Sequence, residues 1–174
     1  MLTIGHSNRT LAELLAMLAA HKVDLLVDVR TVPRSRHNPQ FNSETLPEPL
    51  ASGGIRYLHM PGLGGLRYPR KDSRNTGWRN LSFRGYADYM QTPEFEESLA
   101  QLLRLEEGSR GAIMCAESVP WRCHRSLIAD ALTAHGIPVF HIMTAGKADP
   151  HKLRGFAKVE GNTVTYPPAE LELF

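Results

Sequence analysis

The chain opens with a strand, a helix and a second strand. Residues 2–4 form a short apolar run, and residues 25–29 form a longer one, as expected of a strand that is covered on both faces. Between them, Thr10 and Glu13 have the spacing of a capping box, and leucines follow at helical spacing (Leu11, Leu14, Leu15 and Leu18). This pattern predicts two parallel strands joined by a right-handed crossover.

The later pattern predicts a larger α/β sheet. In chain order we expect a strand at 55–60, helices at 83–90 and from Thr92 onward, a strand at 111–115, a helix at 123–135, a parallel strand at 137–142 and a hairpin at 156–166. Segments 30–53 and 61–82 are predicted as long loops, the first of which lacks a helical period and contains one short helix. The expected fold is a single domain over residues 1–174. It is a three-layer α/β sandwich with a mostly parallel, Rossmann-like sheet and a small C-terminal β-hairpin.

Length and composition narrow the class of protein. A chain of 174 residues is long enough to bury about 70 % of its unfolded surface without a metal or disulfide. No apolar run approaches the ~20 residues that a membrane span needs. The N-terminus lacks the basic segment and long apolar core of a signal peptide. We therefore expect a cytoplasmic protein with no membrane partner, whose two cysteines are free thiols.

Charge is spread unevenly along the chain. Residues 30–84 contain ten basic and three acidic residues, a net charge of +7, whereas the rest contains ten basic and fifteen acidic residues, a net charge of −5. This asymmetry indicates a surface that binds phosphate groups or a polyanion. A solvated loop with dispersed arginines explains it equally well.

Reactive side chains follow several of the predicted strands. Ligands of open parallel sheets bind beyond the carboxyl ends of the strands, so residues at these ends are the candidates for a site. We predict that the site contains His6 and Ser7 after the first strand, Asp28, Arg30 and Arg34 after the second, and Cys115, Glu117, Arg122, Cys123, His124 and Arg125 after the strand at 111–115. The other histidines that lack ligand spacing are interpreted as surface or packing residues (His21, His37, His135, His141 and His151).

Several of these motifs resemble one known family. Its motifs match Ile4-Gly5-His6-Ser7, Asp28-Val29-Arg30, Leu63-Gly64-Gly65, Cys115-Ala116-Glu117 and Cys123-His124-Arg125. The chain resembles, over nearly its whole length, the bacterial and archaeal family called domain of unknown function 488. The resemblance implies a single α/β domain and the place of a site, but it implies no activity.

Two interpretations give the cysteines a chemical role. In the first, Cys115 is a thiolate nucleophile whose pKa is lowered by loop N–H groups, the following helix and an arginine. The loops of protein tyrosine phosphatases and rhodaneses work this way, although six residues separate Cys115 from Arg122, more than those loops allow. In the second, Cys115, Cys123 and His124 bind zinc or iron, with His6 or His59 as a further ligand. Neighbouring Cys123 and His124 would point apart on a helix, which speaks against this site.

Two further interpretations leave Cys115 unreactive. In one, Glu117 or Asp28 acts as a general base while Arg30, Arg122 and Arg125 hold a phosphate. In the other, Cys115 is an inert residue beneath the loop and Glu117 pairs with Arg125.

The function that we predict is that of an enzyme that binds a phosphate-bearing ligand, either a nucleotide or a nucleic acid. In this hypothesis Arg30 and Arg125 position the anion, Glu117 or His6 is the acid–base group, and Cys115 is the nucleophile. The alternatives are a non-catalytic nucleic-acid-binding or sensor domain and a Cys/His metal-binding protein. The residues indicate no particular cofactor or oligomeric state.

Overall fold

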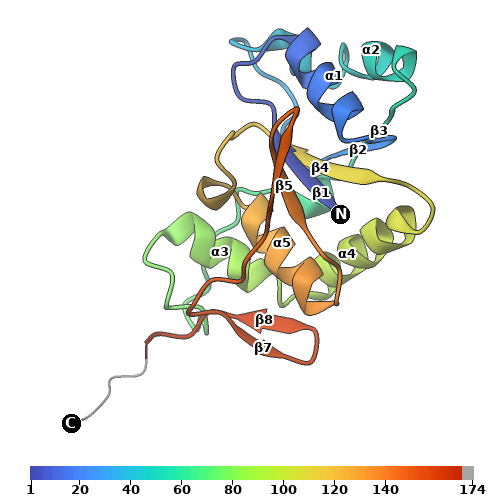
Figure 1. The fold of residues 1–174 in the computed structure, drawn as a ribbon. Coiled ribbons are helices and arrows are strands. Elements are labelled where there is room, and N and C mark those ends of the chain that lie inside the picture. Colours follow the sequence, from blue (N-terminus) through green and yellow to red (C-terminus); the bar gives the residue numbers. More distant parts are fainter. Residues whose placement is uncertain (170–174) are drawn as a thin grey trace.

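A six-stranded sheet forms the middle layer of the molecule (Figure 1). The computed structural model describes residues 1–169. The strands are β1 (Leu2–Gly5), β2 (Leu25–Asp28), β3 (Arg56–His59), β4 (Gly111–Cys115), β5 (Phe140–Thr144) and β6 (Lys147–Pro150). Their order is β3-β2-β4-β1-β5-β6. Every neighbouring pair is parallel except β5 and β6, so the predicted, mostly parallel sheet is confirmed.

Helices cover both faces of the sheet, which makes the three layers that the sequence predicts (Figure 1). On one face lie α1 (Leu11–Ala20) and α2 (Pro47–Ser52), whose leucines pack on β1 and β2. On the other face lie α3 (Leu81–Tyr89), α4 (Pro93–Glu106) and α5 (Arg125–Ala134). The predicted C-terminal hairpin consists of β7 (Lys158–Glu160) and β8 (Thr163–Thr165). No helix in the described part of the chain is long and apolar enough to cross a membrane.

The helix ends follow the signals in the sequence. At the start of α1, the Glu13 backbone N–H donates to Thr10 Oγ1 at 3.1 Å, and the Thr10 N–H donates to Glu13 Oε2 at 2.6 Å. This is the expected capping box, in which each side chain satisfies a free backbone N–H. After α5, Gly136 has a φ of 77°, a left-handed conformation that glycine adopts readily.

The register of the sheet brings the ends of three strands together. Gly5 at the end of β1 lies beside Cys115 at the end of β4. On the other side of β4, Asp28 at the end of β2 lies beside Met114. The loop that leaves β4 is therefore flanked by the segments that follow β1 and β2, as the predicted site requires.

Two elements differ from the prediction. The polar segment of β6 pairs with β5 as an antiparallel edge strand, whereas the sequence suggested no strand there. The helix expected to begin at Cys123 begins instead at Arg125, because a 3₁₀ turn over Pro120–Arg122 comes first and Cys123 is extended, with φ −131° and ψ 148°. Cys123 and His124 thus lie before the helix.

A buried polar chain joins the sheet, α5 and the C-terminal hairpin. His141 Nδ1 lies 2.7 Å from Thr3 Oγ1, and its Nε2 lies 2.9 Å from His151 Nδ1. His151 Nε2 donates to Asp130 Oδ1 at 2.7 Å, and the Tyr166 hydroxyl donates to Asp130 Oδ2 at 2.5 Å. His141 and His151 are therefore packing residues in the interior, and they connect four elements by hydrogen bonds.

Candidate functional site

The loop after β4 is held against the segment that follows β1. The His6 N–H donates to Cys115 O at 3.0 Å, and the Ser7 N–H donates to Ala116 O at 2.9 Å. Gly5 makes this approach possible, because a Cβ atom at position 5 would collide with the backbone of Glu117. Ser7 has a φ of 52°, which turns the chain away after this contact. The position of the Cys115 loop thus depends on a glycine in the neighbouring strand.

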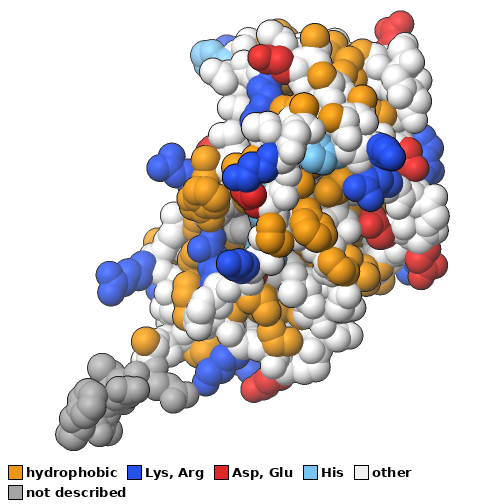
Figure 2. All heavy atoms as spheres, viewed as in Figure 1, with side chains coloured by type: hydrophobic (Ala, Val, Ile, Leu, Met, Phe, Trp, Pro, Cys, Tyr) orange, Lys and Arg blue, Asp and Glu red, His pale blue; other side chains and the backbone are white. Residues whose placement is uncertain are grey.

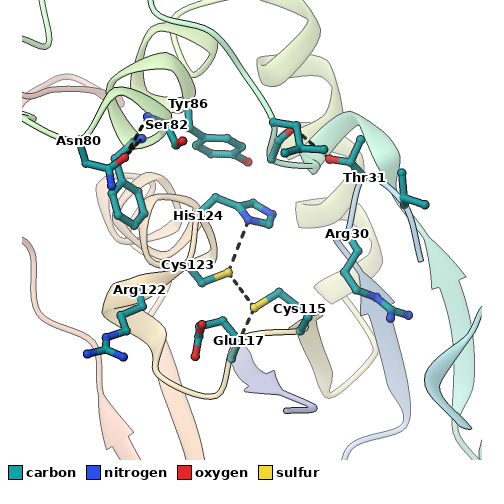
Figure 3. A pocket seen from close by; sticks show the side chains of 15 residues that line it. Arg30, Thr31, Asn80, Ser82, Tyr86, Cys115, Glu117, Arg122, Cys123 and His124 are labelled. Carbon is teal, nitrogen blue, oxygen red and sulfur yellow. Dashed lines mark hydrogen bonds between the residues drawn. The ribbon is translucent and has the colours of Figure 1, made fainter. Parts of the chain in front are cut away.

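The two cysteines meet beneath this loop, as Figure 3 shows. Cys123 Sγ donates to Cys115 Sγ at a distance of 2.7 Å. Both thiols are free, and the two residues are only 2 % and 8 % exposed. Cys115 ends β4 and Cys123 precedes α5, so the contact between their sulfur atoms brings together the two ends of the seven-residue loop between them.

Arg125 is the cation that acts on both sulfur atoms. The residue is 1 % exposed, and its Nη2 donates to Ser118 O at 3.2 Å. Its Nε and Nη1 atoms have no hydrogen-bond partner among residues 1–169, and no described carboxylate forms an ion pair with it. A buried guanidinium is stable only near a negative charge.

The Cys115 sulfur is the atom that can carry this negative charge. Burial raises the pKa of the Cys115 thiol, and so does the negative charge of Glu117. The hydrogen bond from Cys123 and the charge of Arg125 lower it. The lowering effects are the larger, so the pKa lies below its ordinary value. The hydrogen bond to Cys115 and burial raise the pKa of Cys123 well above its ordinary value. Cys115 is therefore the more acidic thiol of the pair, and Cys123 is the protonated donor.

His124 lies on the other side of Cys123. Its Nε2–H donates to Val29 O at 2.9 Å, so its Nδ1 carries the lone pair. This Nδ1 lies 3.5 Å from Cys123 Sγ. Burial lowers the pKa of His124 to about 4, which keeps the imidazole neutral near pH 7. The extended backbone at Cys123 allows the two neighbouring side chains to meet, contrary to the expectation that they would point apart on a helix.

The end of β2 provides a second buried polar cluster. Asp28 is fully buried and accepts hydrogen bonds from Arg30 Nε at 2.9 Å, from Arg30 Nη2 at 2.6 Å and from the Tyr57 hydroxyl at 2.6 Å. Arg30 Nη2 also donates to Phe41 O at 2.6 Å. Arg30 Nη1 lies 3.2 Å from His6 Nε2. Most of the Arg30 N–H groups therefore already donate to acceptors within the protein, and Asp28 holds the guanidinium in position.

A pocket of about 510 Å³ opens between these two clusters. Its wall includes both cysteines and residues from α3, from the 61–82 loop and from the segments that follow β2 and β4 (Arg30, Thr31, Val32, Gly65, Leu66, Asn80, Ser82, Phe83, Tyr86, Cys115, Ala116, Glu117, Arg122, Cys123 and His124). This volume lies in the range of about 300–1,000 Å³ that small-molecule sites have. In Figure 3, Cys115 and Cys123 lie between Arg30 on one side and Arg122 on the other.

The predicted site residues therefore fall into two groups. Cys115, Glu117, Arg122, Cys123, His124 and Arg30 line the pocket, whereas Asp28, His6 and Arg125 lie behind it. Ser7 bonds its own neighbour Asn8, and Arg34 forms an exposed ion pair with Glu44. Glu117 is exposed and does not pair with Arg125. Within residues 1–169, no group of three or more His, Cys, Asp or Glu side chains is arranged to hold a metal ion, and this includes Cys115, Cys123 and His124 with His6 or His59.

Sequence reasoning missed part of the pocket wall. Thr31 Oγ1 donates to Gly65 O at 2.9 Å, which ties the 61–82 loop to the segment after β2. Asn80 caps α3 by accepting from the N–H groups of Ser82 and Phe83. An asparagine directly before a helical segment is a recognisable N-cap, and it could have placed the start of this helix at the site.

A comparison with protein-family models identifies the group to which the chain belongs. The family described as "Domain of unknown function DUF488" matches residues 10–132. The chain is a member of this DUF488 family. The match covers Asp28, Arg30 and the whole stretch from Cys115 to Arg125, while His6 and Ser7 precede it. No curated protein and no solved structure matches the chain.

The buried histidines of this DUF488 protein make its stability depend on pH. Burial lowers the pKa of His6 and His124 to about 4 and that of His141 to about 3. In the unfolded chain a histidine has a pKa of about 6.5, so below this pH the unfolded state binds more protons than the folded state. The free energy of unfolding should therefore be largest above pH 6.5 and should fall steadily between pH 6.5 and 4.

Urea denaturation at pH 7.5, 6.5, 5.5 and 4.5 measures this effect. Replacing the exposed His37 with glutamine is the matched control and should leave the pH profile unchanged. Equal free energies of unfolding at pH 7.5 and 4.5 would contradict the assignment of three neutral buried imidazoles.

Proposed function

We propose that this DUF488 member is an enzyme that binds a phosphate-bearing small molecule, such as a nucleotide, and attacks it with the Cys115 thiolate. The observation that carries the proposal is the contact between Cys115 and Cys123 in the field of Arg125, a buried cation with no carboxylate partner among residues 1–169. Nucleophilic cysteines occur in such electropositive surroundings next to a pocket, whereas inert buried cysteines do not.

The pocket wall supports an anionic ligand with an apolar part. Arg122 is exposed at the rim, and no described carboxylate pairs with it. The N-terminal ends of α3 and α5 also reach the pocket, and a helix N-terminus favours a negative charge. Val32, Leu66 and Phe83 add an apolar surface that suits a planar group such as a nucleobase.

The chemical step follows from these positions. The Cys115 sulfur forms a bond to an electrophilic atom of the ligand, and the bond from this atom to its leaving group breaks. The leaving group takes the electron pair and a proton from solvent. Water then displaces the sulfur, and the exposed Glu117 carboxylate accepts the proton of this water. Cys115 returns as the thiolate, with its charge again stabilised by Arg125.

Alkylation by iodoacetamide tests the thiolate. Peptide mapping between pH 5 and 9 should show that Cys115 reacts, with a midpoint below the value of about 8.5 for an ordinary cysteine, and that Cys123 does not. The Cys115→Ser variant should lose the reaction. A Cys115 midpoint at or above 8.5 would contradict the nucleophile.

Protection from the same reagent tests the anionic ligand. Inorganic phosphate or adenosine monophosphate should slow the alkylation of Cys115, and Arg122→Ala should weaken this protection. Unchanged alkylation at saturating concentrations of both probes would remove the phosphate-bearing ligand from the proposal.

A nucleic-acid-binding module is the second candidate function. Tyr68 is 91 % exposed in the basic 61–82 loop, and an exposed aromatic residue among cations is typical of single-strand binding surfaces. On the face drawn in Figure 2, however, Lys and Arg side chains stand among apolar ones rather than in one continuous patch. Strongly salt-dependent binding of a single-stranded oligonucleotide, unchanged by Cys115→Ser, would favour this candidate over the enzyme.

A further inference from the structure

We propose that Cys115 and Cys123 form a reversible dithiol–disulfide pair that switches the site off when it exchanges with a small disulfide in the pocket. The proposal rests on the proposed function only in taking Cys115 as the attacking thiolate. It adds a role for Cys123, which the enzyme proposal leaves as a hydrogen-bond donor.

The first observation that supports the disulfide is the short distance between the two sulfur atoms. They lie 2.7 Å apart, whereas non-bonded atoms of the interior are separated by about 3.5–4.0 Å and a disulfide bond is about 2.05 Å long. Neither residue is inside a helix, since Cys115 is the last residue of β4 and Cys123 is extended. A small side-chain rotation is therefore enough to bring the sulfurs into bonding distance.

The second observation that supports the disulfide is that a small molecule in the pocket can reach both cysteines. Both cysteines line the 510 Å³ pocket together with the exposed Arg122 and Glu117. In Figure 3 the two sulfurs face each other between the pocket walls. A small disulfide that enters the pocket meets Cys115 and Cys123 at the same place, so both exchange steps can occur without movement of the chain.

The roles of the two sulfurs differ because their neighbours differ. Arg125, two of whose buried nitrogens have no partner in the described part of the chain, favours negative charge on Cys115. Cys123 keeps its proton, and the Nδ1 lone pair of His124 lies 3.5 Å from its sulfur. Cys115 is therefore the sulfur that attacks first, and Cys123 is the sulfur that resolves the adduct.

The electrons, protons and leaving groups of the two exchange steps are as follows. The Cys115 thiolate attacks one sulfur of a small disulfide, the bond between the two sulfurs of that molecule breaks, and one thiolate leaves. Cys123 then attacks Cys115 Sγ, and its proton passes to the second small thiolate, which leaves as a thiol. The small disulfide has gained two electrons, and the protein holds a Cys115–Cys123 disulfide that lacks the nucleophile until a dithiol reduces it.

Intact-mass measurement after treatment with oxidised glutathione tests the pair. The reduced wild-type protein should lose two hydrogen atoms and retain no glutathione, and dithiothreitol should restore both the mass and the alkylation of Cys115. Cys123→Ser should accumulate a stable glutathione adduct on Cys115, and Cys115→Ser should form neither product.

The outcomes separate this inference from the enzyme proposal. A wild-type protein that stays reduced, or that keeps the glutathione adduct, while iodoacetamide still alkylates Cys115 overturns the pair and leaves the nucleophile in place. Failure of Cys115 to react with either reagent overturns both. A thermal unfolding midpoint recorded for each variant shows that the protein compared is folded.

Discussion

Replacing Asp28 with alanine is expected to lower the free energy of unfolding by about 3–5 kcal/mol, the usual cost of removing one partner of a buried ion pair. Asp28 is fully buried and accepts hydrogen bonds from two Arg30 nitrogens and from the Tyr57 hydroxyl. Its removal leaves the Arg30 guanidinium in the interior without a counter-charge. The Tyr57 hydroxyl loses its acceptor at the same time.

Urea denaturation of three variants measures this effect. The double variant Asp28→Ala with Arg30→Met removes both charges and should be more stable than Asp28→Ala alone. Asp72→Ala breaks the exposed pair with Arg70 and should leave the unfolding midpoint nearly unchanged. A loss below about 1 kcal/mol in Asp28→Ala would show that solvent reaches Arg30 and replaces the carboxylate.

Arg125→Met should slow the alkylation of Cys115 at neutral pH by about tenfold for each unit by which the thiol pKa rises. The arginine is 1 % exposed and its charge favours the thiolate form of Cys115. Without this charge, one of the interactions that oppose burial is lost, and the pKa of the Cys115 thiol rises. Methionine has a similar volume, and replacing a buried charge with an apolar side chain of that size is often neutral for stability.

The pH profile of iodoacetamide alkylation provides the measurement for this variant. The midpoint for Cys115 should move to higher pH, while the thermal unfolding midpoint stays close to that of the wild type. Arg125→Lys retains the charge and should keep part of the reactivity. An unchanged alkylation midpoint in folded Arg125→Met would contradict the role of this cation.

The strands and the helix that position the site could be predicted from the sequence, because local sequence signals determine them. Apolar runs placed the strands, the Thr10–Glu13 capping box placed α1, and the parallel topology brought the ends of β1, β2 and β4 together. Cys115 and Arg30 were therefore assigned to one edge of the sheet without knowledge of any contact.

The remaining details depend on tertiary contacts that no local pattern encodes. Strand β6 is polar and ends at Pro150, so it has neither alternation nor apolar content, and only its pairing with β5 makes it a strand. The sequence also could not show that Arg30 is held by Asp28 and Phe41 O rather than free to bind an anion. In the same way, Asp130 and His151 meet only after the chain has folded.

The strand order also determines when the site can form during synthesis. Strand β4 lies between β1 and β2, so Leu2 pairs with Ala112 and Leu25 pairs with Gly111, residues that are 110 and 86 positions apart in the sequence. Until residues 111–115 have left the ribosome, β1 has no neighbour on this side and β2 has only β3. Contacts of such long range form slowly, because a large loop must close first. Until the cysteine loop arrives, the nascent N-terminal half therefore exposes both edges of β1 and one edge of β2, and such unpaired edges are prone to aggregation.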